Sequence, residues 1–326
     1  MEIMAPTANR PLKPRVACVH CGERGEPACG NLCPGLSFRK PVSRITIRAG
    51  KFLRLLDYME RIGLDSEAMA TSIGLSPNAL QALSPEEQLP AQQYSRLYKA
   101  AVNGMQSLGR PLPWAAGLGS EAFELMCHCM ISGRTLGDAL RLASRFDELL
   151  YPVIGYRVSL EEEGGSKLVK LGYQVDASID QSELVPSQWD RADSGATVSR
   201  SSGLLVWHSL CGWLTGQSIE AREMRIAGPF VSQEYYDGLT GVFHCPIYFD
   251  ADENCFSFQR DALSRRLVHT VDSLSEFLDN AVYQLIEMER EPARTSAAIK
   301  SIVTIELPGS MPSIREIAET PDSYTH

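Results

Sequence analysis

The sequence predicts an α+β protein, with an all-helical N-terminal part followed by a mixed domain. That domain is expected to hold a small, mainly antiparallel sheet packed by helices. Three observations predict this class. Apolar side chains recur with a helical period from Ile47 onward. The turn Glu163-Gly164-Gly165-Ser166 joins two alternating segments, as in a hairpin. Further short apolar segments of strand length follow after residue 220.

The first sixty residues after Ile47 are expected to be helical throughout. Apolar residues lie on one face of each segment, and Gly63 and Gly74 end the first two. Ser76 is placed to cap the third helix, because Pro77 is favoured at the first helical position. The four predicted helices are Phe52–Ile62, Ser66–Ile73, a short helix that opens at Pro77, and Pro90–Leu108.

The middle of the chain predicts helices and strands together. Thr135–Leu150 has an inward apolar stripe, and Ser194–Leu214 is apolar on nearly all sides, so it is expected to be buried. Residues 261–290 read as one long helix or two broken ones. The remaining predicted elements are the hairpin strands Tyr156–Glu161 and Lys167–Val175, strands at Glu223–Ile226, Pro246–Phe249 and Cys255–Phe258, and a helix at Ser296–Ile305.

Charge is unevenly distributed along the chain, whose formal net charge is −9. The first 50 residues carry eight basic and three acidic side chains, and the remaining 276 carry 23 basic and 37 acidic ones. An acidic body repels phosphate, so it is not expected to bind nucleic acid by itself. Ser66–Leu83 resembles a helix-turn-helix, but residues 65–90 contain no Lys or Arg to hold DNA. The run Glu161-Glu162-Glu163 is expected to be solvated.

No apolar run approaches the roughly 20 residues that span a bilayer, and the N-terminus does not read as a secretory signal. Five cysteines of the body lie among apolar residues, where reduced Cys packs as a small hydrophobic side chain. These five are Cys127, Cys129, Cys211, Cys245 and Cys255. Together these features predict a cytoplasmic protein.

Residues 1–44 are rich in Pro, Gly, Cys and Arg and show no helical or strand period, so they predict a disordered tail. This tail holds the one constellation of residues with metal chemistry. Four thiolates satisfy tetrahedral zinc, and His20 is a substitute ligand. The seven-residue gap between the two pairs is shorter than the usual zinc spacing, so the alternative is a tail without metal. The four cysteines are Cys18, Cys21, Cys29 and Cys33.

Aromatic residues suggest where a small molecule binds. Trp207 and His208 lie on the buried helix, and Phe146 and Tyr151 lie at the junction of the preceding helix with the hairpin. A pocket between helix and sheet is apolar with few polar anchors, as small-molecule sites usually are. These four residues are therefore the candidate ligand contacts. The alternative is that they are ordinary core, with His208 hydrogen-bonded inside it.

The order of several loose motifs supplies a family resemblance. The helix pair at 63–76 precedes Leu89-Pro90, then Gly117-Leu118-Gly119, and then the segment 132–140. Gly228-Pro229 and the segment 246–258 follow. In this order, residues 47–319 resemble the N-terminal effector-binding domain of one branch of AraC-type transcription regulators. The resemblance implies a small-molecule effector, a C-terminal helix-turn-helix domain that binds DNA, and no enzymatic activity.

The resemblance also predicts the domain boundaries. The tail covers 1–44, the effector-binding domain covers 45–307, and a linker with the start of a helix-turn-helix domain covers 308–326. The segment 312–319 matches only the beginning of the family's first helix-turn-helix, so we expect a truncated regulator. Such a chain senses an effector and forms homodimers, or heterodimers with full-length regulators. It contacts DNA only in a full-length form.

Two other classes of function stay open at this point. The first is an enzyme of unknown type acting on a small molecule, although no Ser/His/Asp set, phosphate-binding glycine loop or carboxylate pair appears at a known spacing. The second is a zinc-dependent interaction protein built on the N-terminal cysteines.

Overall fold

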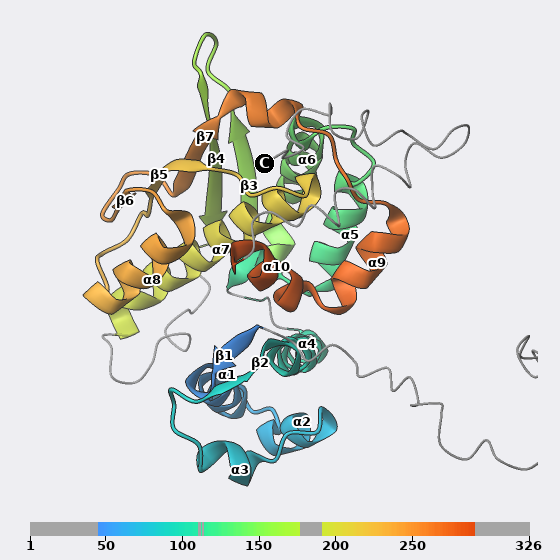
Figure 1. Ribbon diagram of the computed structural model, residues 1–326, viewed down its shortest axis with the longest axis vertical. Helices are drawn as coiled ribbons and strands as arrows, with labels where there is room; N and C mark the ends of the chain where they lie inside the picture. Colours follow the sequence, from blue (N-terminus) through green and yellow to red (C-terminus); the bar gives the residue numbers. More distant parts are fainter. Residues whose placement is uncertain (1–44, 110–111, 113, 177–190, 291–326) are drawn as a thin grey trace, which may run out of the picture. The chain divides into compact units, whose positions relative to one another are not determined.

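The computed structural model describes residues 45–109, 112, 114–176 and 191–290, and every structural statement below concerns this part of the chain (Figure 1). The predicted α+β class is confirmed. A two-stranded sheet has the order β1-β2, and a five-stranded sheet has the order β3-β4-β7-β5-β6. The predicted zinc cysteines, the predicted helix at 296–305 and the segment 312–319 that resembles the start of a helix-turn-helix lie outside the described residues.

The N-terminal part is helical, as predicted, apart from one small sheet. Asp65 accepts a hydrogen bond from the amide of Ala68 at 2.8 Å, and Ser76 caps the following helix. The strands β1 and β2 pair antiparallel, so the expectation of helices alone was wrong here. Strands of three residues are too short to show an alternating pattern, and Leu89-Pro90 resembles a helix start. The elements are β1 (Thr46–Arg48), α1 (Ala49–Arg61), α2 (Ser66–Ser72), α3 (Pro77–Gln81), β2 (Gln88–Pro90) and α4 (Ala91–Ser107).

Two helices precede the large sheet. The sequence analysis did not predict α5 (Glu121–Met130), whose start is capped by Ser120. A capping box formed by Thr135 and Asp138 opens α6 (Leu136–Ile154), which ends at Gly155 with φ 73°. This helix runs four residues past its predicted end, although it contains Pro152, which cannot donate the amide hydrogen bond of a regular helix.

The large sheet is mainly antiparallel, as predicted, and only β5 and β6 pair in parallel. Val158 of β3 lies opposite Tyr173 of β4, and both side chains are buried. Alternate positions such as Lys170 are half-buried, so one face of the sheet packs on the core. The strands are β3 (Tyr156–Glu161), β4 (Leu168–Val175), β5 (Ala221–Arg225), β6 (Ile247–Tyr248) and β7 (Cys255–Gln259).

Helices cover the buried face of this sheet (Figure 1). The helix α6 packs against β3, while the long helix α7 (Arg191–Thr215) packs against β4 and α10. A short helix, α8 (Gln233–Phe243), leads into β6. Residues 261–290 form two helices rather than one, α9 (Val271–Asp279) and α10 (Ala281–Arg290), preceded by the 3₁₀ turn η3 (Arg260–Ser264).

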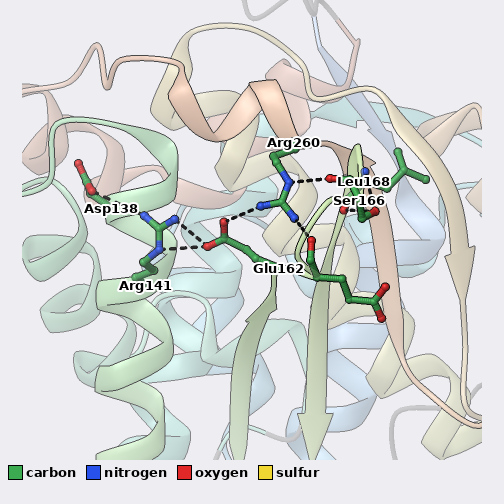
Figure 2. A network of polar contacts seen from close by, with 7 residues as sticks. Asp138, Arg141, Glu162, Ser166, Leu168 and Arg260 are labelled. Atoms are coloured by element: carbon green, nitrogen blue, oxygen red, sulfur yellow. Dashed lines mark hydrogen bonds and ion pairs between the residues drawn. The ribbon is translucent and has the colours of Figure 1, made fainter.

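Two arginines hold the tip of the β3–β4 hairpin (Figure 2). Glu162 accepts hydrogen bonds from Arg141 of α6, the shorter at 2.7 Å, and from Arg260 at 3.3 Å. Arg260 also donates to the carbonyl oxygen of Ser166 at 2.8 Å. All three residues of the acidic run are exposed, as expected, but Glu162 is also paired with arginines from segments far away in the sequence. The hairpin tip is tied to both α6 and η3.

Candidate functional site

Trp207 and His208, predicted as ligand contacts, lie in the closed core. Trp207 has no exposed surface, and His208 is 6% exposed. The His208 Nε2 atom lies 2.7 Å from the carbonyl oxygen of Ile219, and its ring packs against Phe243 and Phe256. Burial lowers the pKa of His208, so the ring is neutral at physiological pH. The Trp207 Nε1 and His208 Nδ1 atoms have no hydrogen-bond partner within the described residues.

Phe146 and Tyr151, the other predicted contacts, lie on α6. Both side chains are half-buried, and Phe146 packs against the core. The guanidinium of Arg157 lies 5.0 Å from the Tyr151 ring centre, so this ring is next to β3. His208 is next to Phe256 of β7, two strands further along the sheet. The two predicted pairs therefore lie against different strands, and their role in binding stays a prediction.

A left-handed turn that follows α4 lies beside buried tyrosines. Ala115, Ala116 and Gly117 have φ values of 52°, 49° and 66°. Two consecutive alanines in this region are strained, because their Cβ atoms crowd the backbone. An added Cβ at Gly117 would overlap the Tyr156 hydroxyl, so only glycine fits there. Tyr173 also lies beside the backbone of Ala116, and its ring centre is 6.3 Å from that of Tyr156.

A buried carboxyl group of α6 lies close to these tyrosines. Asp147 is 1% exposed, and its Oδ2 atom accepts a hydrogen bond from the Val158 amide at 3.0 Å. Burial raises the pKa of Asp147 to about 7, and its Oδ1 atom has no partner within the described residues. Tyr156 and Cys127 lie near enough for its charge to raise their pKa values further. Its position four residues after Ala143, on the inward stripe of α6, was the signal available in the sequence.

A groove of about 440 Å³ lies among α1, α2 and α3. This volume is in the range of small-molecule sites. The groove is lined by apolar side chains and by four carboxylates, and sequence reasoning missed it. In the sequence its residues are those of an ordinary helix surface. The only feature that distinguishes the segment is the absence of Lys and Arg between Arg61 and Arg96. The lining residues are Leu53, Leu56, Asp57, Glu60, Leu64, Asp65, Ser66, Glu67, Pro77 and Gln81.

The carboxylates of the groove differ in their partners. Asp57 forms an ion pair with Arg61 at 3.2 Å, and Asp65 caps α2. The side chains of Glu60 and Glu67 form no hydrogen bond or ion pair with other described residues. These two exposed carboxylates are therefore available to a ligand.

Cysteine and metal chemistry is limited in the described residues. The thiols of Cys127, Cys211, Cys245 and Cys255 are free and buried, as predicted, whereas that of Cys129 is exposed. Cys129 points outward because it lies two residues after Cys127 on α5, on the opposite side of the helix. No group of three or more possible metal ligands occurs in residues 45–290 outside the gaps in the description. The same residues contain no helix that is long and apolar enough to cross a membrane.

Comparison with known protein families gives one match that covers most of the chain. Residues 63–267 match the arabinose-binding domain of AraC transcription regulators, N-term. Among solved structures, the transcriptional regulator CdpR from Pseudomonas aeruginosa is similar, with 16% identity and a TM-score of 0.33. That alignment covers 82% of this chain and 74% of CdpR. Comparison with curated proteins gave no match.

Proposed function

Because this chain belongs to the family of AraC transcription regulators with an N-terminal arabinose-binding domain, we propose that it senses a small-molecule effector for transcription control. The observation that carries this proposal is the match over residues 63–267, which spans α2 through η3. The proposed role is regulatory rather than enzymatic. The protein is proposed to act in the cytoplasm, where regulators of this family bind DNA.

The groove among α1, α2 and α3 is the proposed effector site. It is open, whereas Trp207 and His208 are reached only if the core opens. Two of the helices that line the groove, α1 and α2, pack against α4, and Lys99 of α4 forms an ion pair with Asp279 of α9 at 3.0 Å. An effector that shifts α1–α3 therefore acts on α4 and, through it, on the rest of the domain.

The output of sensing is proposed to be a change in assembly. The partners are a second copy of this chain, or a full-length regulator that carries the DNA-binding domain. A ligand shifts such an equilibrium only by its difference in affinity for the two states. Effector binding is thus expected to change either the fraction of dimer or the geometry within it.

A thermal-shift screen of metabolites with the complete chain tests this function. A true effector raises the midpoint of unfolding, and the rise grows with the logarithm of its concentration, since it binds the folded state. Light scattering with and without each hit then reports the assembly state. The proposal that this chain senses an effector is wrong if no metabolite shifts the midpoint of unfolding. It is also wrong if the metabolites that shift the midpoint change neither the assembly state nor the binding of a full-length partner to DNA.

The predicted contacts are tested with the same hits. Trp207→Phe and His208→Asn keep much of the packing, and Phe146→Leu and Tyr151→Phe keep most of the volume. A loss of affinity in one of these variants, with Glu60→Gln unaffected, would move the effector site from the groove to the core.

A further inference from the structure

We infer that the outer face of α6 binds the same face of a second copy of this chain, an inference that deepens the proposed change in assembly and rests on it. Leu149 and Val153 are 81% and 78% exposed, more than any other large apolar side chain among the described residues. Single exposed apolar residues are common on protein surfaces, but these two lie one helical turn apart on the same side of α6. Together they form an apolar patch that is open to solvent, which is typical of an interaction surface.

This patch is the end of a longer apolar stripe along α6. Leu142 and Phe146, both half-buried, continue it towards the start of the helix. From Leu142 through Phe146 and Leu149 to Val153, the intervals are four, three and four residues, the spacing by which helices pack in a coiled coil. Ala143, on the adjoining side of the helix, is buried in the core. The stripe therefore lies beside the face that holds α6 in its own domain.

The order of the intervals fits a second copy of the chain as the partner. Four, three and four read the same in both directions, so a twofold axis between positions 147 and 148 brings the stripe onto itself with the two helices antiparallel. Leu142 then lies opposite Val153 of the other copy, and Phe146 lies opposite its Leu149. Each apolar side chain of the stripe thus meets another apolar side chain, which unequal outer intervals would not achieve.

Charges beside the stripe are complementary in the same arrangement. Arg145 and Glu148 are exposed and flank the stripe on the same side. Arg145 forms no hydrogen bond or ion pair with other described residues, and the side chain of Glu148 is 67% exposed although it is paired with Arg157 of β3. Across the twofold axis, Arg145 faces position 150 of the other copy, about 3 Å along the helix from Glu148. Each Arg145 is therefore within reach of Glu148 of the other copy, and the dimer contains this pair twice.

The stripe is short, so the dimer is expected to be weak. From Leu142 to Val153 the helix rises by about 16 Å, and interfaces of small area are typical of transient complexes. A weak dimer suits the proposed function, because a modest difference in effector affinity between monomer and dimer is enough to shift the equilibrium.

Analytical ultracentrifugation of the complete chain without metabolite, from about 1 to about 100 μM, should show reversible dimers. Leu149→Glu with Val153→Glu places four carboxylates in the seam and is expected to weaken the dimer about 100-fold or more. The matched control is Leu108→Glu with Val271→Glu, which makes the same change in charge at the end of α4 and in α9 and should leave the dimer unchanged. All four side chains are exposed, so both double variants are expected to fold, and circular dichroism checks this.

An exchange of charges tests the antiparallel register. Arg145→Glu alone and Glu148→Arg alone each bring like charges together across the axis and are expected to weaken self-association about tenfold. An equimolar mixture of these two variants restores an opposite pair at both contacts, so it should dimerise about as tightly as the unchanged protein. An effect confined to one copy of the chain cannot produce such a gain on mixing.

The possible outcomes separate this inference from its alternatives. A monomer at every concentration overturns it, as does a dimer that survives Leu149→Glu with Val153→Glu or is weakened equally in both double variants. A mixture of the charge variants that is no tighter than either alone overturns it too. If Leu149→Glu with Val153→Glu lowers the midpoint of unfolding and leaves assembly unchanged, the stripe is covered within one chain and the inference is wrong. Failure of effector sensing appears separately, as a metabolite screen without any hit, because the dimer is measured without metabolite.

Discussion

The indole Nε1 of Trp114 donates a hydrogen bond to the hydroxyl of Tyr98 at 2.8 Å, and both side chains are buried. Tyr98 belongs to α4, and Trp114 opens the left-handed turn that contacts the sheet tyrosines. The ring of Tyr58 from α1 packs edge-on against Trp114, with ring centres 4.9 Å apart. This bond therefore links α1 and α4 to the turn beside the large sheet.

Removing the Tyr98 hydroxyl should destabilise the protein more than its size suggests. Tyr98→Phe leaves the buried Trp114 N–H without a partner, which costs about 1–3 kcal/mol. Chemical denaturation measures the loss, and Tyr248→Phe, at a tyrosine that is 50% exposed, is the control. Equal small effects of both substitutions would show that the bond contributes little.

The left-handed turn offers a matched pair of glycine substitutions. Gly117 and Gly119 have φ values of 66° and 81°, so alanine is strained at both, by about 1–2 kcal/mol. At Gly119 the nearest atom to an added Cβ is 3.8 Å away, whereas at Gly117 it would overlap Tyr156. Gly117→Ala should therefore cost about 1–3 kcal/mol more than Gly119→Ala, which denaturation measures.

Tyr156→Phe in the Gly117→Ala background removes the oxygen that meets the new Cβ. We expect this second substitution to recover part of the lost stability. If Gly117→Ala and Gly119→Ala are equally stable, the turn is able to move away from Tyr156.

Local signals in the sequence predicted most of the large elements. The alternation and turn residues placed the β3–β4 hairpin, and the apolar circumference of α7 predicted its burial. Ser76 and Pro77 placed the start of α3 through their capping chemistry. These features depend on neighbours a few residues away, so a single sequence is enough to find them.

The site features depend on contacts between distant segments and were missed for that reason. The groove forms only when α1, α2 and α3 pack together, and no short motif records its shape. Glu162 reads as solvated until Arg141 and Arg260 are brought to it. Asp147 was missed as well, although its position on the apolar stripe of α6 is a signal that the sequence itself contains.

A half-buried histidine should make the protein sensitive to mild acid. His269 stacks on Trp213 with ring centres 3.7 Å apart, and burial lowers its pKa from 6.5 to about 4. Between these values the unfolded chain binds a proton that the folded chain excludes. The contribution of neutral His269 to the free energy of unfolding is therefore fully present above pH 6.5. It is lost as the pH drops towards 4, by about 3 kcal/mol in total.

Denaturation across pH 4 to 8 measures this dependence. His269→Gln should flatten the acid limb, while His128→Gln, at an exposed histidine of α5, should leave it unchanged. An acid limb of the same slope in all three proteins would assign the effect to other groups.

Asp147 should act in the opposite direction, at the alkaline end. Burial raises its pKa from 3.8 to about 7, so between these values the folded chain holds a proton that the unfolded chain releases. Stability is therefore greatest below pH 3.8 with respect to this group and falls as the pH rises to 7. The full cost to the stability of the folded protein is about 4 kcal/mol above that pH.

Asp147→Asn keeps an acceptor for the Val158 amide and cannot ionise, so its stability should exceed that of the wild type at pH 8. Asp252→Asn, at an exposed aspartate, is the control and should show the wild-type slope. A wild-type slope in Asp147→Asn would mean that the carboxyl stays ionised in the core, where a bound cation or water must then satisfy its Oδ1 atom.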